Sequence, residues 1–290
     1  MMKLFDLHCD TLWEVYHKNQ NPHISFDKVK SYDVYTQIFA IYSDNKLSDD
    51  EAYREFREII NFHKSFINTF PQNFKYYLAV EGANILAGDI VRLDVLYNAG
   101  IRFLTLVWAG LSCIGGAHRT DLGLTEFGKA TVHGCFKLGI VPDLSHSSEH
   151  LFWDTVNIAD EYNKPIIATH SNSRTICKHS RTITDEMFTA IKNRGGIVGI
   201  SLCRLHLSDT DKCNIDTVIA HIDHFMSLGG ENNVCMGCDF DGTEQLPDEI
   251  SDISDMYRIY DRLLSLNYSA ELADKIFYNN AKNFILRNEL

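Results

Sequence analysis

Histidine and carboxylate side chains follow several apolar runs of this sequence, at the point where each run ends. His8 and Asp10 close the first run, Glu81 follows a later one, and His146 and His170 end two more. Imidazole nitrogens and carboxylate oxygens are ligands that borderline divalent cations such as Zn²⁺ accept. Such a cation lowers the pKa of bound water and polarises a carbonyl, so the chemistry indicated is metal-assisted hydrolysis.

Spacing brings some of these ligands together. His8 and Asp10 are two residues apart, so on an extended strand their side chains leave the same face. As an alternative, this pair alone is equally well read as a structural histidine and a helix-capping aspartate. Glu81 ends a strongly apolar run, where a carboxylate is costly unless it is paired or bound to a cation, and a buried ion pair is its alternative. Asp239 and Asp241 end the last apolar run.

Two further pairs look like metal ligands and are interpreted otherwise. Cys235 and Cys238 have an odd separation on a predicted strand, which puts the two thiols on opposite faces. His221 and His224 share one face of a predicted helix, a pattern more typical of a solvated surface than of a metal site.

His146 and His170 are different, because both stand at strand ends with carboxylates opposite. This arrangement favours two Zn²⁺ ions, with Glu81 able to bridge them.

The residues must be positioned by alternating strands and helices. About eight short apolar runs alternate with stretches of helical period, which predicts repeated βα units around a parallel sheet. The fold class predicted is α/β, a single (β/α)8 TIM-type barrel over residues 1–290 with extra C-terminal helices from about residue 250, because no linker marks a domain boundary. The predicted strands are Lys3 to Leu7, Val34 to Ile41, Tyr76 to Val80, Phe103 to Val107, Ile140 to Leu144, Ile166 to Thr169, Ile197 to Leu202 and Val234 to Gly237.

Composition excludes several classes of partner. The 290 residues include 27 Lys and Arg against 39 Asp and Glu, a formal charge of −12, so we expect neither nucleic acid nor a membrane surface as partner. Asp6 interrupts the N-terminus before a signal-peptide core could form, and a cytoplasmic location is expected. The eight cysteines are scattered and are interpreted as reduced, mostly buried thiols.

Several ordered motifs carry a resemblance to a known family. The sequence resembles the membrane (renal-type) dipeptidase family of the amidohydrolase superfamily, from residue 6 to about 285. The resemblance implies a binuclear zinc barrel that hydrolyses dipeptides, often with a D residue at the C-terminal position. Members are often dimeric, so a homodimer is one expectation. The motifs are Asp6-Leu7-His8-Cys9-Asp10-Thr11, Glu81-Gly82, Gly123-Leu124-Thr125-Glu126-Phe127-Gly128, Asp143-Leu144-Ser145-His146, His170-Ser171-Asn172-Ser173 and Asp239-Phe240-Asp241-Gly242.

The resemblance also implies a role for each ligand. His8 and Asp10 would hold one Zn²⁺, or another divalent metal, His146 and His170 would hold the second, and Glu81 would bridge the two beside a hydroxide nucleophile.

The remaining roles concern the substrate. Arg181 matches the arginine that pairs with the substrate carboxylate, and Arg174 is nearer His170 but fits the spacing less well. Asp239 matches the carboxylate that transfers the proton to the leaving amine, and Asp241 either supports it or serves as a turn carboxylate.

One departure from the family concerns the residue after the fourth strand. Many members carry a histidine there, whereas this chain has Trp108, which can donate one hydrogen bond but cannot take up a proton at neutral pH. We interpret this as a subgroup with altered substrate preference, in which His118 in the following loop partly substitutes. Thr182 after Arg181, where Asn is frequent, is a second departure.

Two alternative functions remain at this point. One is an amidohydrolase that acts on another small amide, a cyclic amide or a lactone, for which Arg181 would matter little. The other is a metal-binding homologue without turnover, which the presence of Trp108 makes conceivable.

Overall fold

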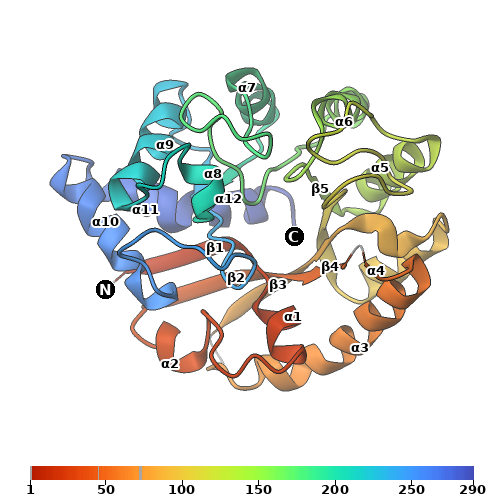
Figure 1. The fold of residues 1–290 in the computed structure, drawn as a ribbon, viewed down its shortest axis with the longest axis horizontal. Coiled ribbons are helices and arrows are strands. Elements are labelled where there is room, and N and C mark those ends of the chain that lie inside the picture. The colour runs from red at the N-terminus through yellow and green to blue at the C-terminus, as the bar shows by residue number, and fades with distance from the viewer. Residues whose placement is uncertain (1, 45, 72–73) are drawn as a thin grey trace.

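The computed structural model describes residues 2–44, 46–71 and 74–290. Among them, seven parallel strands form one curled sheet in the order β5-β4-β3-β2-β1-β7-β6, and the helices surround it (Figure 1). This confirms the predicted α/β class with a parallel sheet. The strands are β1 (Lys3–Cys9), β2 (Val34–Tyr42), β3 (Lys75–Glu81), β4 (Ile101–Thr105), β5 (Val141–Asp143), β6 (Val198–Ile200) and β7 (Val234–Met236).

The predicted strand at 166–169 does not form as a strand. Ile167 makes one isolated parallel bridge to Asp143 of β5, and Ala168 makes another to Val198 of β6. The backbone N–H groups of Thr169 and His170 donate instead to the side chains of Asp143 and Ser145. The segment thus lies between β5 and β6, the two end strands of the sheet. Its backbone N–H groups at Thr169 and His170 bond to side chains, so no continuous strand pairing forms there.

The helices begin where the sequence supplies caps. Ser48 and Glu51 form the predicted reciprocal cap of α3, each accepting a backbone N–H of the other. The C-terminal helices are present as predicted. The helices are α1 (Thr11–Tyr16), α2 (Phe26–Val29), α3 (Asp49–Ile67), η1 (Ala83–Leu86), α4 (Val91–Asn98), α5 (Glu126–Leu138), α6 (Glu149–Tyr162), α7 (Asp185–Asn193), α8 (Arg204–Leu207), α9 (Ile215–Ser227), η2 (Ile253–Asp255), α10 (Met256–Ser265), α11 (Ala270–Asp274), η3 (Lys275–Asn279) and α12 (Asn280–Arg287).

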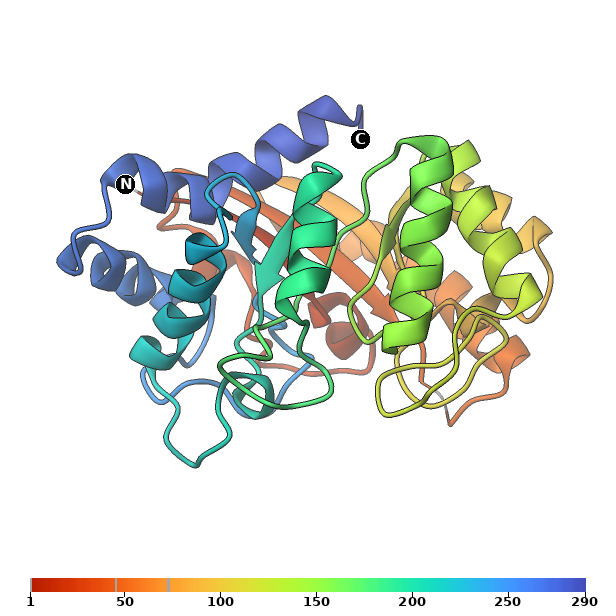
Figure 2. The same cartoon turned by 90° about the horizontal axis from the view of Figure 1, so that it is seen from above.

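The apolar core has two parts. A large cluster joins the sheet to the surrounding helices, and a smaller one gathers side chains from the strands, such as Phe5, Ile38 and Phe103, against Phe284 of α12. In Figure 2, α12 crosses one end of the sheet, and the long loops after β4 and after residue 170 extend from the opposite end. The loops that could carry a functional site therefore lie at the end of the sheet opposite to the one that α12 covers.

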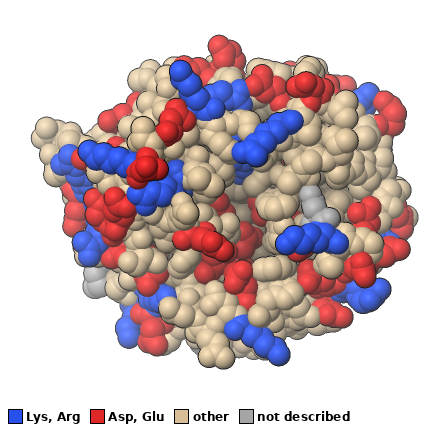
Figure 3. Space-filling model, in the orientation of Figure 1, with Lys and Arg blue, Asp and Glu red and all other residues tan. Residues whose placement is uncertain are grey.

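The surface carries more acidic than basic side chains in the central region of the face drawn in Figure 3, in keeping with the excess of Asp and Glu in the sequence. On that face (Figure 3), acidic side chains gather near the centre, and basic ones are scattered around it. No helix among the described residues is both long and apolar enough to cross a membrane.

Candidate metal centre and active site

The strand ends bring the predicted ligands to one place. Parallel strands end at the same edge of a sheet, so residues at or just after the ends of β1, β3, β5 and β7 and of the bridging segment 166–169 become neighbours. Three groups of side chains each offer ligand atoms that lie within 4.8 Å of one another and could hold a metal ion. They are His8, Asp10 and Glu81; Glu81, His146 and His170; and His8, His170 and Asp239.

Glu81 lies at the centre of this arrangement. Its Oε1 atom is 3.0 Å from Nε2 of His146, 3.3 Å from Nε2 of His170 and 3.5 Å from Nε2 of His8. The rings of His8 and His170 stack with their centroids 3.8 Å apart. Three imidazoles from three segments therefore converge on one carboxylate oxygen, a position from which Glu81 can share ligands with two neighbouring cations.

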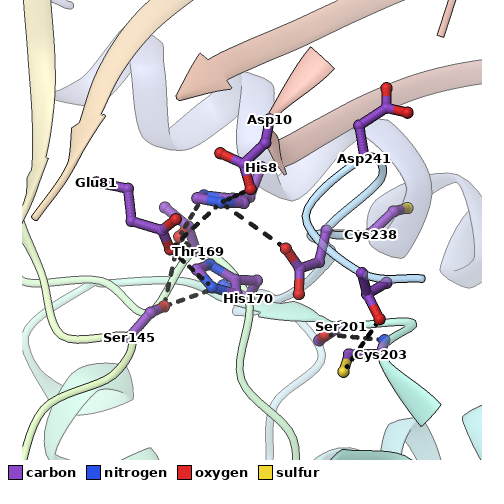
Figure 4. Close-up of polar contacts among 12 residues, drawn as sticks. His8, Asp10, Glu81, Ser145, Thr169, His170, Ser201, Cys203, Cys238 and Asp241 are labelled. Carbon is purple, nitrogen blue, oxygen red and sulfur yellow. Dashed lines mark hydrogen bonds and ion pairs between the residues drawn. The ribbon is translucent and has the colours of Figure 1, made fainter. Parts of the chain in front are cut away.

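Two further carboxylates approach His8. Nε2 of His8 is 3.8 Å from Oδ2 of Asp10 (Figure 4). It is also 4.0 Å from Oδ1 of Asp239. The pairing of β1 with β2 shifts by one residue between Asp6 and Cys9, a bulge that re-aims the end of the strand. His8 and Asp10 reach the same cluster, as their spacing predicts.

Several atoms of the cluster lack a hydrogen-bond partner. Nε2 of His8, Oδ1 of Asp10 and Oε1 of Glu81 are buried, and among the described residues they make no hydrogen bond, although Oε1 of Glu81 lies within ion-pair distance of the imidazole nitrogens. An unpaired buried polar atom is costly, and buried carboxylates are normally paired or bound to a cation. A nitrogen and oxygen donor set with open lone pairs fits divalent cations such as Zn²⁺.

Burial shapes the electrostatics of the carboxylates. Desolvation, reinforced by Asp10 and Glu81, raises the pKa of Asp239 to about 8 despite the opposing effect of His8. Desolvation and the nearby Glu81 also raise the pKa of Asp10 to about 6, and burial raises the pKa of Glu81. When these three buried carboxyl groups are ionised, their negative charges repel one another, and a bound cation would relieve that repulsion.

Burial among carboxylates shifts the pKa values of the three imidazoles in different directions. Burial lowers the pKa of His8, but Glu81, Asp10 and Asp239 outweigh it and raise that pKa to about 10. Burial lowers the pKa values of His146 and His170, so these rings stay neutral and keep a lone pair for a ligand.

Two site residues have a backbone conformation that is rare for residues other than glycine. His146 has φ 70° and Asp239 has φ 63°, both in the left-handed region. Such conformations cost free energy and persist where the surrounding structure enforces them, typically at functional sites. Here they turn the side chains after β5 and β7 toward the cluster.

Four residues of the cluster, Asp10, Glu81, His146 and Asp239, line a pocket of about 370 Å³. Of the predicted substrate-binding residues, Arg181, Trp108, His118 and Asp239 all line it. Sequence reasoning missed other residues of the wall. Tyr42 is the last residue of β2, one beyond the predicted end of that strand, so a closer reading of the strand ends could have found it. The others missed are Trp13, Glu14, Ala109, Cys203 and His206.

Arg181 is held at the rim of the cluster. Its guanidinium donates to Oγ of Ser171 at 3.1 Å and to the carbonyl of His170 at 3.1 Å, and its Nε has no hydrogen-bond partner among the described residues. Arg174, the nearer alternative, bonds to Glu149 and to the carbonyl of Thr182 and is absent from the pocket wall. The structure therefore places Arg181 in the pocket and not Arg174.

Trp108 and His118 both lie near His146. The Trp108 ring packs edge-on against Tyr42 with centroids 4.8 Å apart and lies 6.2 Å from the His146 ring. The His118 ring is 6.1 Å from that of His146, and its Nδ1 is 3.0 Å from Oγ of Ser180. Burial and the neighbouring Arg181 lower the pKa of His118 to about 4. His118 is thus a neutral imidazole in the pocket wall.

Other residues singled out in the sequence have structural roles. Asp241 accepts hydrogen bonds from Thr11 and from the backbone of His23, as a turn carboxylate does, although it also borders the pocket. Cys235 and Cys238 pack in different core clusters, as their spacing predicts.

The surface interpretation is wrong for His221. This ring is buried, and its two nitrogens contact the backbone N–H of Ser173 and the carbonyl of Leu207. Long loops fold over this face of α9, which helical period alone does not reveal.

Comparison with known proteins identifies the family. Residues 67–287 match the profile of the membrane dipeptidases, peptidase family M19. The chain belongs to the membrane dipeptidase family. It is 32% identical over 213 residues to the "uncharacterized protein in pqqA 5′ region" of Klebsiella pneumoniae, over 69% of this chain and 77% of that one. It is 27% identical over 263 residues to Dipeptidase 3 of Mus musculus, over 83% of this chain and 53% of the mouse protein, of which it thus spans about half.

Solved structures of this family share the fold. The crystal structure of dipeptidase AC, a metallopeptidase of family M19, superposes with a TM-score of 0.92 at 22% identity, over 99% of this chain and 98% of that one. A metallopeptidase from Rhodobacter sphaeroides, liganded with a phosphinate mimic of the dipeptide L-Ala-D-Ala, gives 0.91 at 22% identity, over 99% of both chains. The family match and these superpositions together agree with the resemblance found in the sequence.

Proposed function

We propose that this chain is a metallodipeptidase that binds two Zn²⁺ ions and hydrolyses dipeptides, including those with a D residue at the C-terminal position. The observation that carries the proposal is the presence of Arg181 and the Glu81 cluster in one pocket. Support comes from the family, from the mouse relative described as a dipeptidase, and from the R. sphaeroides relative liganded with a dipeptide mimic.

The two ligand groups that share Glu81 suit two cations. His8 and Asp10 would hold one and His146 and His170 the other, with Glu81 between them. Cations bound there would supply Lewis acidity for a carbonyl oxygen and a lowered pKa for water. The chain contributes a fixed set of donors, so little rearrangement is needed on binding.

Arg181 provides the counter-charge for a substrate carboxylate. A guanidinium offers donors in a planar fork that matches a carboxylate, and this one is preset by its bonds to Ser171 and His170. Anchoring that end of a dipeptide would orient its single peptide bond toward the cluster. Asp239, which lines the same pocket beside His8, would carry a proton to the leaving amine.

The aromatic wall sets the space left for the substrate. Trp108, Tyr42 and Trp13 form a continuous series of edge-on ring contacts beside the cluster. Many family members carry a histidine at the position of Trp108, and its imidazole could carry a proton. Trp108 would instead pack against the substrate, and His118 supplies a neutral imidazole nearby. We further infer that the seven strands and the bridging segment 166–169 together constitute the (β/α)8 barrel of the family.

The deciding experiment measures metal content and hydrolysis together. Protein reconstituted with Zn²⁺ and a chelated control would be assayed on a panel of L-L and L-D dipeptides. About two metals per chain with chelator-sensitive release of amino acids is the expected result. Two metals without turnover would contradict dipeptide hydrolysis and direct attention to cyclic amides and lactones, while no bound metal would overturn the proposal.

A further inference from the structure

Thr169 occupies a central position behind the metal ligands. Its hydroxyl oxygen is 2.9 Å from Nδ1 of His170, 3.4 Å from Nδ1 of His8 and 2.6 Å from Oδ2 of Asp143. The side chain is buried, and Figure 4 shows it beside His8 and His170. One hydroxyl thus faces the outer nitrogen of a histidine in each of the two ligand groups.

Asp143 determines the direction of these hydrogen bonds. Its Oδ1 accepts from the backbone N–H groups of Ser145 at 3.0 Å and Thr169 at 2.9 Å, and its Oδ2 accepts from the hydroxyls of Thr105 and Thr169, each at 2.6 Å. A threonine hydroxyl has one hydrogen and two lone pairs. Because the hydrogen of Thr169 is donated to Asp143, only its lone pairs remain for its other neighbours, which are Nδ1 of His170, Nδ1 of His8 and Oγ of Ser145 at 3.4 Å.

An oxygen lone pair selects a protonated nitrogen. The carboxylates around His8 favour a second proton on its Nε2, and a bound cation would replace that proton. With a cation bound, His170 and His8 would both carry their hydrogen on Nδ1 and direct the lone pair of Nε2 to the centre, where both nitrogens face Oε1 of Glu81. We propose that Thr169, backed by Asp143, is a positioning residue that holds His8 and His170 in the metal-binding tautomer at once. The inference rests on the proposed metal centre. His146 is different, since its Nδ1 has no hydrogen-bond partner among the described residues.

The first test compares zinc affinity in matched variants. Thr169→Val keeps the shape but removes the hydroxyl, and Thr169→Ser keeps the hydroxyl. Thr155→Val removes a buried hydroxyl that, among the described residues, donates to the carbonyl of Leu151 in the same helix, α6. Metal affinity and stoichiometry would be measured by chelator competition, with circular dichroism to establish folding. Loss of an outer hydrogen bond to a ligand typically weakens metal binding 10- to 100-fold. We expect that loss in Thr169→Val, near-parental affinity in Thr169→Ser, and no change in Thr155→Val.

Parental affinity in folded Thr169→Val, or equal losses in the Val and Ser variants, would overturn the proposal. A second test needs no substitution: nitrogen NMR of the zinc-loaded protein labelled at histidine reports which ring nitrogen binds metal. Coordination through Nε2 with a proton on Nδ1 is expected for His8 and His170, and coordination through Nδ1 of either would overturn it. Zinc binding without dipeptide hydrolysis would contradict the proposed function while leaving the role of Thr169 intact.

Discussion

Gly242 lies so close to Asp10 that a β-carbon at position 242 would collide with the Oδ2 atom of that ligand and also with Oδ1 of Asp239. The two carboxylates approach the cluster only because this residue has no side chain. Gly242→Ala should displace both and weaken zinc binding by at least about tenfold, the order of effect expected when a ligand is misplaced. Metal titration checks this. Gly139→Ala, at a left-handed helix end with open space around it, should cost about 1–2 kcal/mol of stability and leave metal content unchanged.

Glu81 should be needed for the second metal. Glu81→Gln keeps the size of the side chain but removes the charge that three imidazoles share. We expect the protein to retain at most one zinc and to lose nearly all dipeptide hydrolysis. Two tightly bound metals with full activity in this variant would contradict the shared-ligand assignment.

Arg181 should act on substrates that carry a free carboxylate. Hydrogen bonds between charged groups contribute about 1.5–3 kcal/mol each, so Arg181→Ala should lower kcat/KM for dipeptides by roughly 100-fold. The same variant should hydrolyse dipeptide amides, which lack the carboxylate, about as well as the parent protein does. Arg174→Ala, which removes an arginine that bonds to Glu149 outside the pocket, is the matched control. An Arg181 variant with parental kcat/KM would favour a neutral cyclic substrate.

His118 should contribute to turnover if it compensates for Trp108. Its imidazole lines the pocket beside His146, where Trp108 cannot exchange a proton. We expect His118→Ala to lower kcat by about tenfold, within the range of a hydrogen bond made in the transition state, with metal content preserved. His133→Ala, at a ring that bonds to Tyr162 on the far side of α5, should have no effect on kcat. Unchanged turnover in His118→Ala would disprove the compensation.

His221 should make the fold sensitive to acid. Burial lowers its pKa to about 4, below the value of about 6.5 in an unfolded chain. The unfolded state therefore binds the proton first, so stability is full above pH 6.5 and is lost as the pH falls toward 4. Linkage gives a loss of roughly 2 kcal/mol by pH 4.5. In urea unfolding, His221→Gln should show a smaller loss between pH 7 and pH 4.5 than the parent, whereas His150→Gln at an exposed site should not.

The sequence by itself determined where the ligands stand in the fold. An apolar β-branched run followed by a histidine or carboxylate is a local pattern, and a parallel sheet brings the ends of its strands to one edge. His8, Asp10, Glu81, His146 and His170 could therefore be predicted to converge without knowledge of their distances. The helix caps were equally predictable, because Ser48 and Glu51 interact within one turn.

The tertiary structure decided how the pocket wall is held and which residues complete it. Arg181, which the family resemblance already favoured over Arg174, turns inward because Ser171 and the carbonyl of His170 accept its hydrogen bonds. Tyr42, which the sequence did not indicate, joins the wall by packing against Trp108. These contacts are made by loops, which have no periodic sequence pattern, so the sequence does not predict them.

The same reason explains the predicted strand that did not form and the histidine tautomers. The backbone N–H groups of Thr169 and His170 donate to the side chains of Asp143, at the end of β5, and of Ser145 just beyond it. The hydroxyl of Thr169 lies 3.4 Å from Nδ1 of His8, which is 161 positions earlier in the chain. A hydrogen bond between residues more than a hundred positions apart depends on the packed sheet, which composition and spacing do not specify.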